Sequence, residues 1–523
     1  MAASSAGGIP RPAHVLPVQL RLLAADLVGK AGRPDVVVDD ANTSITGITA
    51  SSDLVRPGDL FAALPGARAH GASFVRAAID AGAAAVLTDA EGFGMLPADT
   101  PAVLVSAYDL RERLGDLSSR IYGNPSAHLG LLGVTGTSGK TTTAYLMRAG
   151  LRAAGRVPGV IGTVATMIGD EEVQTGFTTP EAPELQALLA VMRERGVTDV
   201  AMEVSSHALA LGRVHGTSFQ SAGFTNLSED HLDLHGSMEE YFAAKASLFL
   251  NQRYTERAVV VVDDERGKLL ADMLGSDVVT VATDEDERGD WRALDVRQAA
   301  DGTTTFRVEG PTRGDRPPLQ LKMGCAIPGR YNVANALLAL ALLDEDDVDR
   351  HVAAPAISTA TVPGRMERVD AGQPFLAVVD YSHKPAAVDG ALRALRPLTR
   401  GRLIIVLGCG GDRDRGKRPH MGEIAARGAD LLIVTDDNPR SENPAVIRRA
   451  MLDGALGVAP GERGEVVEVG GRADAIAAAV DAAREGDTVL VAGKGHESGQ
   501  EIAGVVHAFD DRLVLRAAIE AAR

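Results

Sequence analysis

Short apolar runs alternate with helical patterns and with glycine- or proline-rich turns along most of the chain. Near the start, residues 59–66 read as a strand that ends in a loop, and residues 77–89 read as a helix followed by a strand. A helical pattern over 109–121 then leads to an apolar run at 129–135. These elements predict a small α/β unit that ends near residue 126.

The rest of the chain repeats the alternation of strands and helices. Four apolar segments within residues 197–283 predict a mostly parallel sheet with crossover helices. Residues 289–325 look like antiparallel strands, a helix is expected from Asn332 to Leu343, and Pro363-Gly364 begins a further series of buried strands. We therefore expect an α/β chain with a disordered lead and three domains, divided as 1–15, 16–126, 127–361 and 362–523.

Composition narrows the choice of partners. The 523 residues carry a formal net charge of −17 and only 4% aromatic residues, which argues against binding to a nucleic-acid backbone or stacking on its bases. The two cysteines lie far apart, which suits a reducing compartment. No signal-peptide pattern begins the chain, and the apolar run at 337–343 is too short to cross a bilayer. We expect a soluble cytoplasmic protein with small-molecule partners.

The stretch 133–143, GVTGTSGKTTT, carries the clearest chemical signal. It lies between a strand pattern and a helical pattern, and its glycines let backbone N–H groups face a phosphate at the helix N-terminus. Lys140 would reach the outer phosphates, and Thr141 would bind Mg²⁺. The loop is a shortened form of the general motif, and the alternative is a glycine-rich turn of no function. The predicted nucleotide-binding residues are Gly136, Thr137, Ser138, Gly139, Lys140, Thr141 and Thr142.

Two later segments offer metal ligands. Glu203 stands near the end of a predicted strand, and a carboxylate close to a phosphate-binding loop is the usual second anchor for Mg²⁺. Within the run 230–235, Asp230, His231, Asp233 and His235 predict either a metal cluster or a polar turn.

Six motifs in series resemble the Mur ligase family. They are GTSGKTT, EVSSH, NLSEDHLDLHGS with YFAAKASLF, PGRYNVANALLA, VPGRME and VVDYSHKP, and they cover nearly the whole chain. The resemblance implies a UDP-substrate-binding domain, a central P-loop ATPase domain with a parallel sheet, and a Rossmann-like amino-acid-binding domain. It also implies ATP-driven formation of an amide bond on a UDP-MurNAc-peptide.

The resemblance assigns further roles in the ATP site. Lys245 would carry a carbamate made from CO₂, which turns a cation into an oxygen ligand. Thr141, Glu203, His231 and carbamylated Lys245 would share the Mg²⁺ ions, with Lys140, Lys245 and His207 in catalysis. Asp233 and His235 would order their loop. The remaining residues expected near the nucleotide are Asn335, Arg365 and Asp380.

The segment 437–440, Asp-Asn-Pro-Arg, resembles the signature of the branch that adds meso-diaminopimelate. Arginines clamp carboxylates with two hydrogen bonds, and acidic side chains accept from ammonium groups, so the segment suits an amino acid with a second amino-acid head. The alternative is an ordinary Asn-Pro turn. The residues predicted to bind diaminopimelate are Arg413, Asp437, Asn438, Pro439, Arg440, Gly493 and Glu497, and those predicted to bind the UDP-MurNAc-dipeptide are Ser52, Thr178, Thr179, Ser205 and Arg213.

The expected reaction activates the D-glutamate carboxylate as an acyl phosphate, which the amine of diaminopimelate then attacks. The base for that amine is not evident, and His207 and His383 are the candidates. Alternatives are addition of L-lysine at the same step, a ligase like folylpolyglutamate synthase, a P-loop GTPase switch, or a nucleotide-binding scaffold. No Asn-Lys-x-Asp sequence supports the GTPase. We expect a monomer that uses ATP and Mg²⁺.

Overall fold

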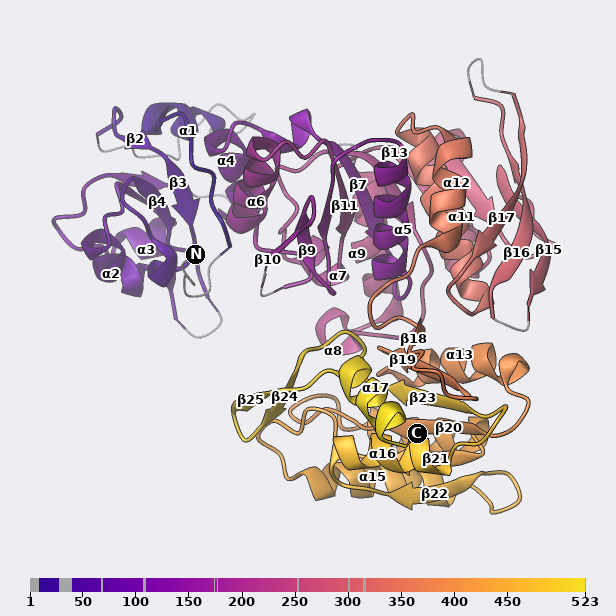
Figure 1. Cartoon of the computed structure of the whole chain (residues 1–523). Helices are drawn as coiled ribbons and strands as arrows, with labels where there is room; N and C mark the ends of the chain where they lie inside the picture. The colour runs from indigo at the N-terminus through magenta and orange to yellow at the C-terminus, as the bar shows by residue number, and fades with distance from the viewer. Residues whose placement is uncertain are drawn as a thin grey trace. The chain divides into compact units, whose positions relative to one another are not determined.

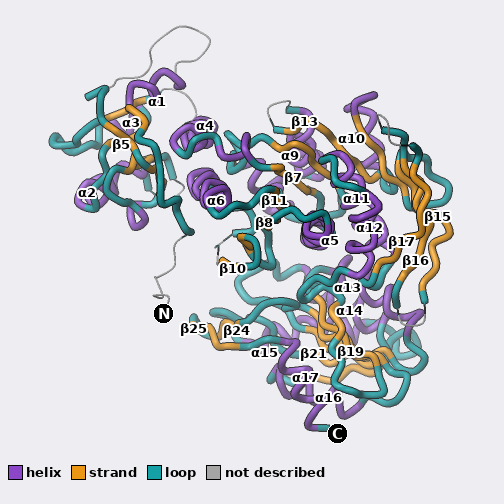
Figure 2. Tube along the Cα trace, turned by 45° about the horizontal axis from the view of Figure 1, so that its top comes forward, coloured by secondary structure: helices purple, strands orange, loops and turns teal. Residues whose placement is uncertain are grey.

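The structure, a computed structural model, describes residues 9–27, 40–66, 69–106, 110–173, 175, 177–251, 254–299, 302–313 and 317–522, without the side chain of Asp233. The chain divides into two compact units. The first comprises Met1–Val281 with Leu338–Ala353, and the second comprises Ala282–Leu337 with Ala354–Arg523. Strands and helices alternate within both units, as Figure 1 and Figure 2 show.

The first unit opens with a small parallel sheet of order β3-β4-β5-β6. Its central strands, β4 (Asp59–Ala62) and β5 (Ala85–Thr88), are wholly buried, as expected for strands covered on both faces. The elements around them are β1 (Val18–Gln19), α1 (Leu20–Leu27), β2 (Ser44–Ile45), β3 (Gly47–Thr49), α2 (Val75–Asp80), α3 (Ala90–Phe93), β6 (Val103–Val105) and α4 (Leu110–Ile121). The predicted small α/β unit is confirmed.

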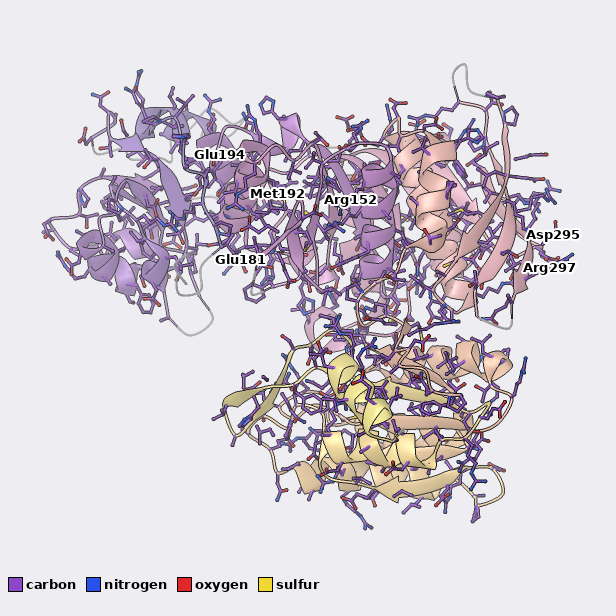
Figure 3. All side chains as sticks on the ribbon, viewed as in Figure 1. Arg152, Glu181, Met192, Glu194, Asp295 and Arg297 are labelled. Atoms are coloured by element: carbon purple, nitrogen blue, oxygen red, sulfur yellow. The ribbon has the colours of Figure 1, made fainter. Side chains whose placement is uncertain are left out.

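The structure describes the N-terminal lead from residue 9 onward, and residues 1–8 lie outside the described part, so the disorder expected over 1–15 stays a prediction. The backbone N–H groups of Ala13 and His14 donate to the Glu194 carboxylate at 2.9 and 2.8 Å. Glu194 ends helix α6 (Ala182–Glu194), and Figure 3 labels it at the opposite end of that helix from Glu181. Composition alone missed these contacts because they join residues about 180 positions apart.

A larger sheet follows in the same unit, with the strand order β10-β9-β8-β11-β7-β12-β13-β14. The six strands from β8 to β14 run parallel, and β9 and β10 pair antiparallel at one edge. The strands are β7 (Gly130–Thr135), β8 (Pro158–Ile161), β9 (Thr166–Ile168), β10 (Glu171–Val173), β11 (Asp199–Glu203), β12 (Phe219–Phe224), β13 (Thr255–Val261) and β14 (Val278–Ala282). The helices are α5 (Lys140–Ala153), α6, α7 (Ser206–Ala210), α8 (Leu232–His235), α9 (Met238–Leu250) and α10 (Glu265–Leu274).

The topology of this sheet creates the site. β7 lies between β11 and β12, and all three are parallel. Their carboxyl ends therefore meet at one edge, where ligands bind in open α/β sheets. The glycine loop follows β7, Ser205 follows β11 and Thr225 follows β12 at that edge.

The second unit contains an antiparallel sheet and a mostly parallel one. β15 (Trp291–Gln298), β16 (Thr304–Gly310) and β17 (Leu319–Cys325) pair antiparallel, as predicted. Trp291, the only tryptophan of the chain, is fully buried on β15, whereas Figure 3 shows Asp295 and Arg297 farther along the same strand. Helix α11 (Arg330–Glu345) confirms the helix expected over 332–343, and α12 (Arg350–Thr359) follows it.

The other sheet of this unit has the order β18-β19-β23-β20-β21-β22, and its five strands β19, β23, β20, β21 and β22 are parallel. Alternate side chains of its inner strands form a core with helices α16 and α17. The elements are β18 (Glu367–Arg368), β19 (Leu376–Asp380), α13 (Pro385–Leu395), β20 (Leu403–Leu407), α14 (Lys417–Gly428), β21 (Leu431–Val434), α15 (Pro444–Gly457), β22 (Glu465–Glu468), α16 (Arg472–Ala482), β23 (Thr488–Ala492), β24 (Gly499–Ile502), β25 (Val505–Ala508) and α17 (Asp511–Ala521).

Within the described residues, no helix combines the length and the apolar character that a membrane crossing needs. The predicted α/β class is confirmed in both units. The domain boundaries proposed from the sequence stay a prediction.

Candidate active site

The glycine loop after β7 is built by close packing. Gly136 has φ +142°, and a Cβ there would overlap the hydroxyl of Thr225, which follows β12. Thr225 Oγ1 in turn donates to the Ser138 carbonyl at 2.6 Å. Gly139 has φ +91° and precedes the first turn of α5. Only glycine fits this close approach, so the loop holds its backbone against the neighbouring strand end.

Two lysines converge on this loop. Lys140 Nζ donates to the carbonyls of Gly136 and Thr137, both at 2.9 Å, and Lys245 Nζ donates to the Gly136 carbonyl at 2.7 Å. Lys245 lies on α9, is 1% exposed, and places its ammonium 4.5 Å from the ring centroid of Tyr241. Positive charge is therefore concentrated at a loop whose backbone suits a phosphate. The carbamate on Lys245 stays a prediction.

Glu203 ends β11 and reaches the first turn of α5. Its Oε1 accepts from the Thr141 hydroxyl at 2.9 Å and from the Thr163 backbone N–H at 2.8 Å, and its Oε2 accepts from the Thr163 hydroxyl at 3.1 Å. The side chain is 1% exposed. A buried carboxylate and a hydroxyl in contact are the oxygen donors that Mg²⁺ prefers, so this pair fits the expected metal.

Three histidine rings and the ring of Tyr241 form a cluster beside the loop. The rings of His207 and His231 lie 4.6 Å apart in an edge-to-face arrangement, and the ring of His235 lies 5.1 Å from that of Tyr241. The Tyr241 hydroxyl lies 3.2 Å from Thr137 Oγ1, and burial raises the pKa of Tyr241, so the phenol is neutral. His231 Nε2 is 3.2 Å from Asp230.

The described side chains contain no group of three or more histidine, cysteine or acidic residues placed to hold a metal. The metal cluster and the polar turn both stay predictions for the run 230–235. His235 Nε2 lies 3.1 Å from Ser206 Oγ, which fits its expected role in ordering the loop. Asp233 was assigned the same role, but its side chain lies outside the described part.

Four of the residues expected to bind the dipeptide come together at the end of β11. Thr179 Oγ1 donates to the Glu203 carbonyl at 3.0 Å and lies 3.4 Å from Ser205 Oγ. Arg213 donates to the Thr179 carbonyl at 3.2 Å, and the Thr178 hydroxyl lies 3.0 Å from that of Thr163. The four residues of this group are Thr178, Thr179, Ser205 and Arg213. Their role in binding stays a prediction.

The fifth residue, Ser52, begins the short 3-10 helix Ser52–Leu54 beside the first small sheet and is half-buried. The loop 66–71 follows in the same part of the chain, and its residues 67 and 68 lie outside the described part. Gly71, at the end of that loop, packs directly on the backbone of Ala63 and Leu64, where a side chain would not fit.

Two of the nucleotide residues expected in the second unit, Arg365 and Asp380, lie at the end of β19. Asp380 accepts from the backbone N–H groups of Met366 at 2.7 Å and Ser382 at 2.9 Å. The Arg365 guanidinium lies 4.3 Å from the ring centroid of Tyr381. Asn335 Nδ2 donates to Asn332 Oδ1 at 3.0 Å on α11. Their contact with a nucleotide stays a prediction.

His383, one of the two candidate bases, is held as a neutral ring. Burial, and then the positive charge of Lys384, lower the pKa of His383 to about 4. Its Nδ1 lies 2.7 Å from the Tyr381 carbonyl, so Nδ1 carries the proton. An imidazole with so low a pKa takes a proton from an ammonium group poorly.

Hydrogen bonds join the Asp-Asn-Pro-Arg segment to the segment after β23. Asn438 Nδ2 donates to Glu497 Oε2 at 2.9 Å. Gly493 has φ +118°, and a Cβ there would lie 2.5 Å from Asp437 Oδ2. The structure thus brings together the carboxylates of Asp437 and Glu497, which were predicted to accept from an ammonium group.

Arg440 stands on the other side of Asn438. It has φ +52°; its Nη1 donates to the Gly411 carbonyl at 2.7 Å, and its Nε lies 3.2 Å from Glu501 Oε2. A Cβ on Gly410 would lie 3.0 Å from Arg440 Nη1 and 4.0 Å from Arg413 Cγ. The two arginines therefore flank Gly410, with Arg413 exposed and Arg440 about one-quarter exposed.

Comparisons with known proteins show to which family the chain belongs. The sequence models named Mur ligase family, catalytic domain; Mur ligase middle domain; and Mur ligase, glutamate ligase domain match residues 44–122, 134–343 and 364–495. A Streptomyces avermitilis protein called UDP-N-acetylmuramoyl-L-alanyl-D-glutamate–2,6-diaminopimelate ligase is 53% identical over 514 residues, which cover 98% of both chains. The chain belongs to the Mur ligase family.

Two further relatives carry the same enzyme name. The protein of Streptomyces coelicolor is 52% identical over 98% of both chains. A solved structure of a ligase of this name superimposes with a TM-score of 0.68 at 30% identity, covering 97% of this chain and 99% of its own. The family and the three-domain α/β class predicted from the motifs are confirmed.

Some charged residues of this Mur ligase site were missed from the sequence. Arg418 pairs with Glu442 through contacts of 2.8 and 3.1 Å and holds the pKa of that carboxyl down, at about 2. Arg472 forms a fully buried pair with Asp511, with two contacts of 2.7 Å. No sequence pattern joins these partners. Lys494, within the run Gly-Lys-Gly-His-Glu, did carry a signal, since a lysine between two glycines in a strand-end loop is a candidate for a site.

Proposed function

We propose that this Mur ligase joins meso-2,6-diaminopimelate to the D-glutamate of UDP-N-acetylmuramoyl-L-alanyl-D-glutamate and converts ATP to ADP and phosphate. One observation carries the proposal: the Asp-Asn-Pro-Arg segment holds the Glu497 carboxylate through the Asn438 amide and, two residues on, carries the guanidinium of Arg440, which donates to the Gly411 carbonyl. That pair suits a head that bears both a carboxylate and an ammonium group. The names of relatives that are 53% and 52% identical support the same substrates.

The first step is the activation of a carboxylate. The D-glutamate carboxylate attacks the γ-phosphorus of ATP, and the bond to ADP breaks. The Lys140 ammonium, which lies on the loop carbonyls, moves to the phosphate oxygens, where charge develops. Thr141 and Glu203 would hold Mg²⁺, which neutralises phosphate charge when bound. A carbamate on Lys245 would add oxygen ligands beside them.

The second step forms the amide bond. The amine attacks the carbonyl of the acyl phosphate, a tetrahedral intermediate forms, and phosphate leaves. Because its low pKa makes His383 a poor acceptor, His207 is the better candidate for the proton of the incoming ammonium group. Thr179, Ser205 and Arg213 would position the dipeptide, so much of the rate comes from alignment of the reactants.

The site is expected to reject L-lysine, which lacks the distal carboxylate. Lysine would leave Arg440 without its anionic partner from the substrate, and a site built for a polar group discriminates strongly against a ligand that lacks it. The loss of one charge-assisted hydrogen bond corresponds to about 1.5–3 kcal/mol, or roughly a 10- to 150-fold preference. The second arginine, Arg413, would increase this preference.

The cytoplasm is the proposed place of action, because ATP and UDP-linked precursors are found there. The monomeric state expected from the sequence belongs to the same proposal.

Phosphate release by the purified protein tests the function. ATP, Mg²⁺, UDP-MurNAc-L-Ala-D-Glu and meso-diaminopimelate together should release phosphate and yield the tripeptide, and omission of either the dipeptide or the amino acid should stop the reaction. L-lysine in place of meso-diaminopimelate is the matched comparison. Equal rates with the two amino acids would refute the assigned specificity, and hydrolysis of GTP without any dipeptide would favour the switch instead.

A further inference from the structure

Lys494 is a buried charge in the wall of the amino-acid site. It follows β23, its side chain is 0% exposed, and its Nζ donates to Asn438 Oδ1 at 3.0 Å and to Glu497 Oε2 at 2.9 Å. Asn438 Nδ2 completes the triangle by donating to the same Glu497 oxygen at 2.9 Å. Buried charges persist only where they are paired, so the ammonium depends on these two partners and they depend on it.

The contacts fix which way the Asn438 amide faces. An ammonium group only donates, so the amide atom that meets Lys494 is the carbonyl oxygen. The backbone N–H of Glu501 donates to the same oxygen at 3.0 Å. The amide N–H₂ therefore faces Glu497. Without the ammonium, one of the three contacts that define this orientation is lost.

The same ammonium orients Glu497. Oε2 accepts hydrogen bonds from both Lys494 and Asn438, and Oε1 takes no part in these two contacts. The Glu497 side chain is 32% exposed, whereas that of Lys494 is 0% exposed. Lys494 thus holds, from the buried side, a carboxylate that is partly open to solvent.

The backbone around Lys494 holds it in place. Gly493 and Gly495 have φ +118° and +55°, and a Cβ on Gly495 would lie 2.7 Å from the Gly364 carbonyl and 2.8 Å from Tyr381 Cβ. This packing leaves the loop little freedom, so the position of the ammonium is set before any ligand binds.

We propose that Lys494 is a positioning residue for the distal ammonium group of the incoming diamino acid. It fixes Asn438 with its carbonyl inward and turns Glu497 so that Oε1 accepts from that ammonium group. This proposal rests on the proposed function, because it concerns the same amino-acid site. Lys494 touches neither the substrate nor ATP in this role; it acts through Asn438 and Glu497.

The test is a substrate ratio. 2-Aminopimelate keeps the distal carboxylate of meso-diaminopimelate but lacks the distal ammonium group, so its binding does not use Glu497. We define the ratio as kcat/KM for meso-diaminopimelate over kcat/KM for 2-aminopimelate, measured by phosphate release. In Lys494→Met, this ratio should fall at least about tenfold, mainly through a higher KM for meso-diaminopimelate, with KM for ATP unchanged.

Lys268→Met is the matched control. Lys268 and Glu265 form a Lys–Glu pair with the same three-residue spacing as Lys494 and Glu497, with 3.2 Å between the charged atoms, but they lie on the surface of α10. The control should keep the wild-type ratio. If Lys494→Met does not give a folded protein, Lys494→Gln replaces it. Its amide keeps one donor for Asn438 without the charge, and its ratio should fall by at least about threefold.

The outcomes separate the two proposals. If the wild-type protein does not use meso-diaminopimelate at all, the proposed function fails. If the wild-type protein does use it but the Lys494 variant keeps or raises the ratio, the positioning role is overturned. An equal loss of activity with both amino acids would also overturn it, because that result indicates a structural role only.

Discussion

We expect two buried carboxyl groups at the amino ends of the central strands to make the stability of the first unit depend on pH. Asp199, at the start of β11, is 0% exposed, and Asp346 is 3% exposed. Both lie over Gly130 at the start of β7, the end of the sheet opposite the glycine loop. Burial and the neighbouring Asp199 raise the pKa of Asp346 from 3.8 to about 7, although Arg156, 3.0 Å from Asp199, opposes the shift.

The direction of this pH dependence follows from the number of protons that the folded and the unfolded chain bind. A pKa that is higher in the folded state means that the folded chain keeps a proton that the unfolded chain releases. The stabilisation is complete below the ordinary pKa of 3.8 and is lost as the pH rises towards about 7. One pKa unit corresponds to about 1.4 kcal/mol, so the shift of Asp346 sets an upper bound of about 4 kcal/mol on the loss in free energy of unfolding.

Asp346→Asn isolates this effect. The amide can donate to Asp199 as the protonated acid does, but it cannot ionise. The stability of the variant relative to the wild type should therefore increase as the pH rises. The difference between their free energies of unfolding should be about 2 kcal/mol larger near pH 8 than near pH 5. Above the folded pKa the advantage should stop growing.

Urea unfolding followed by far-ultraviolet circular dichroism measures this difference. Tryptophan fluorescence does not serve, because Trp291, the only tryptophan, lies in the other compact unit. Asp347→Asn is the control: Asp347 is exposed beside Asp346, and its φ of +58° suits asparagine. Parallel pH profiles for wild type and Asp346→Asn would refute the shared-proton account.

Three further predictions concern the site and its support. Glu203→Gln should lower kcat roughly 100-fold or more at saturating substrates, because Thr141 loses its anionic partner; rescue by excess Mg²⁺ would contradict a loss of chemistry. Arg440→Ala should raise KM for meso-diaminopimelate roughly 10- to 100-fold with KM for ATP unchanged, measured by phosphate release, and a parallel rise in both would contradict the clamp. Arg472→Met should destabilise the second unit by about 3–5 kcal/mol, followed by Trp291 fluorescence, since Asp511 stays buried without its partner. The double variant Arg472→Met with Asp511→Leu should recover most of this loss, and no recovery would contradict it.

Apolar periodicity predicted the buried interior of the fold but not its edges. β7 and β20 are almost wholly buried, and both lie where the sequence indicated a strand. β22 reads Glu-Val-Val-Glu and is only half-buried, because it lies at the edge of its sheet. The hairpin of β24 and β25 was also missed, since β25 is exposed along its whole length and carries no alternation.

The residues of the candidate site also fall into those that the sequence predicted and those that it missed. Motifs that are local in sequence located the glycine loop, Glu203 and the Asp-Asn-Pro-Arg segment, because each lies at a strand end that the periodicity predicts. The missed partners are pairs between distant segments, such as Arg472 with Asp511 and Arg418 with Glu442. Their residue types are ordinary for a surface, and only the fold removes them from water and makes them necessary.

Paired charges explain why a zwitterionic head suits the amino-acid site better than a single charge does. Lys494 offsets Glu497, and Glu501 offsets Arg440, so each charge that would meet the ligand already has a partner behind it. A head with both a carboxylate and an ammonium group adds one contact to each pair and leaves the charge balance unchanged. A lone ammonium group would engage Glu497 but leave Arg440 with no anion except Glu501, and the desolvation of that guanidinium would then go uncompensated. On the proposed function, the selectivity of this site would therefore depend as much on Lys494 and Glu501 as on the motif residues that they contact.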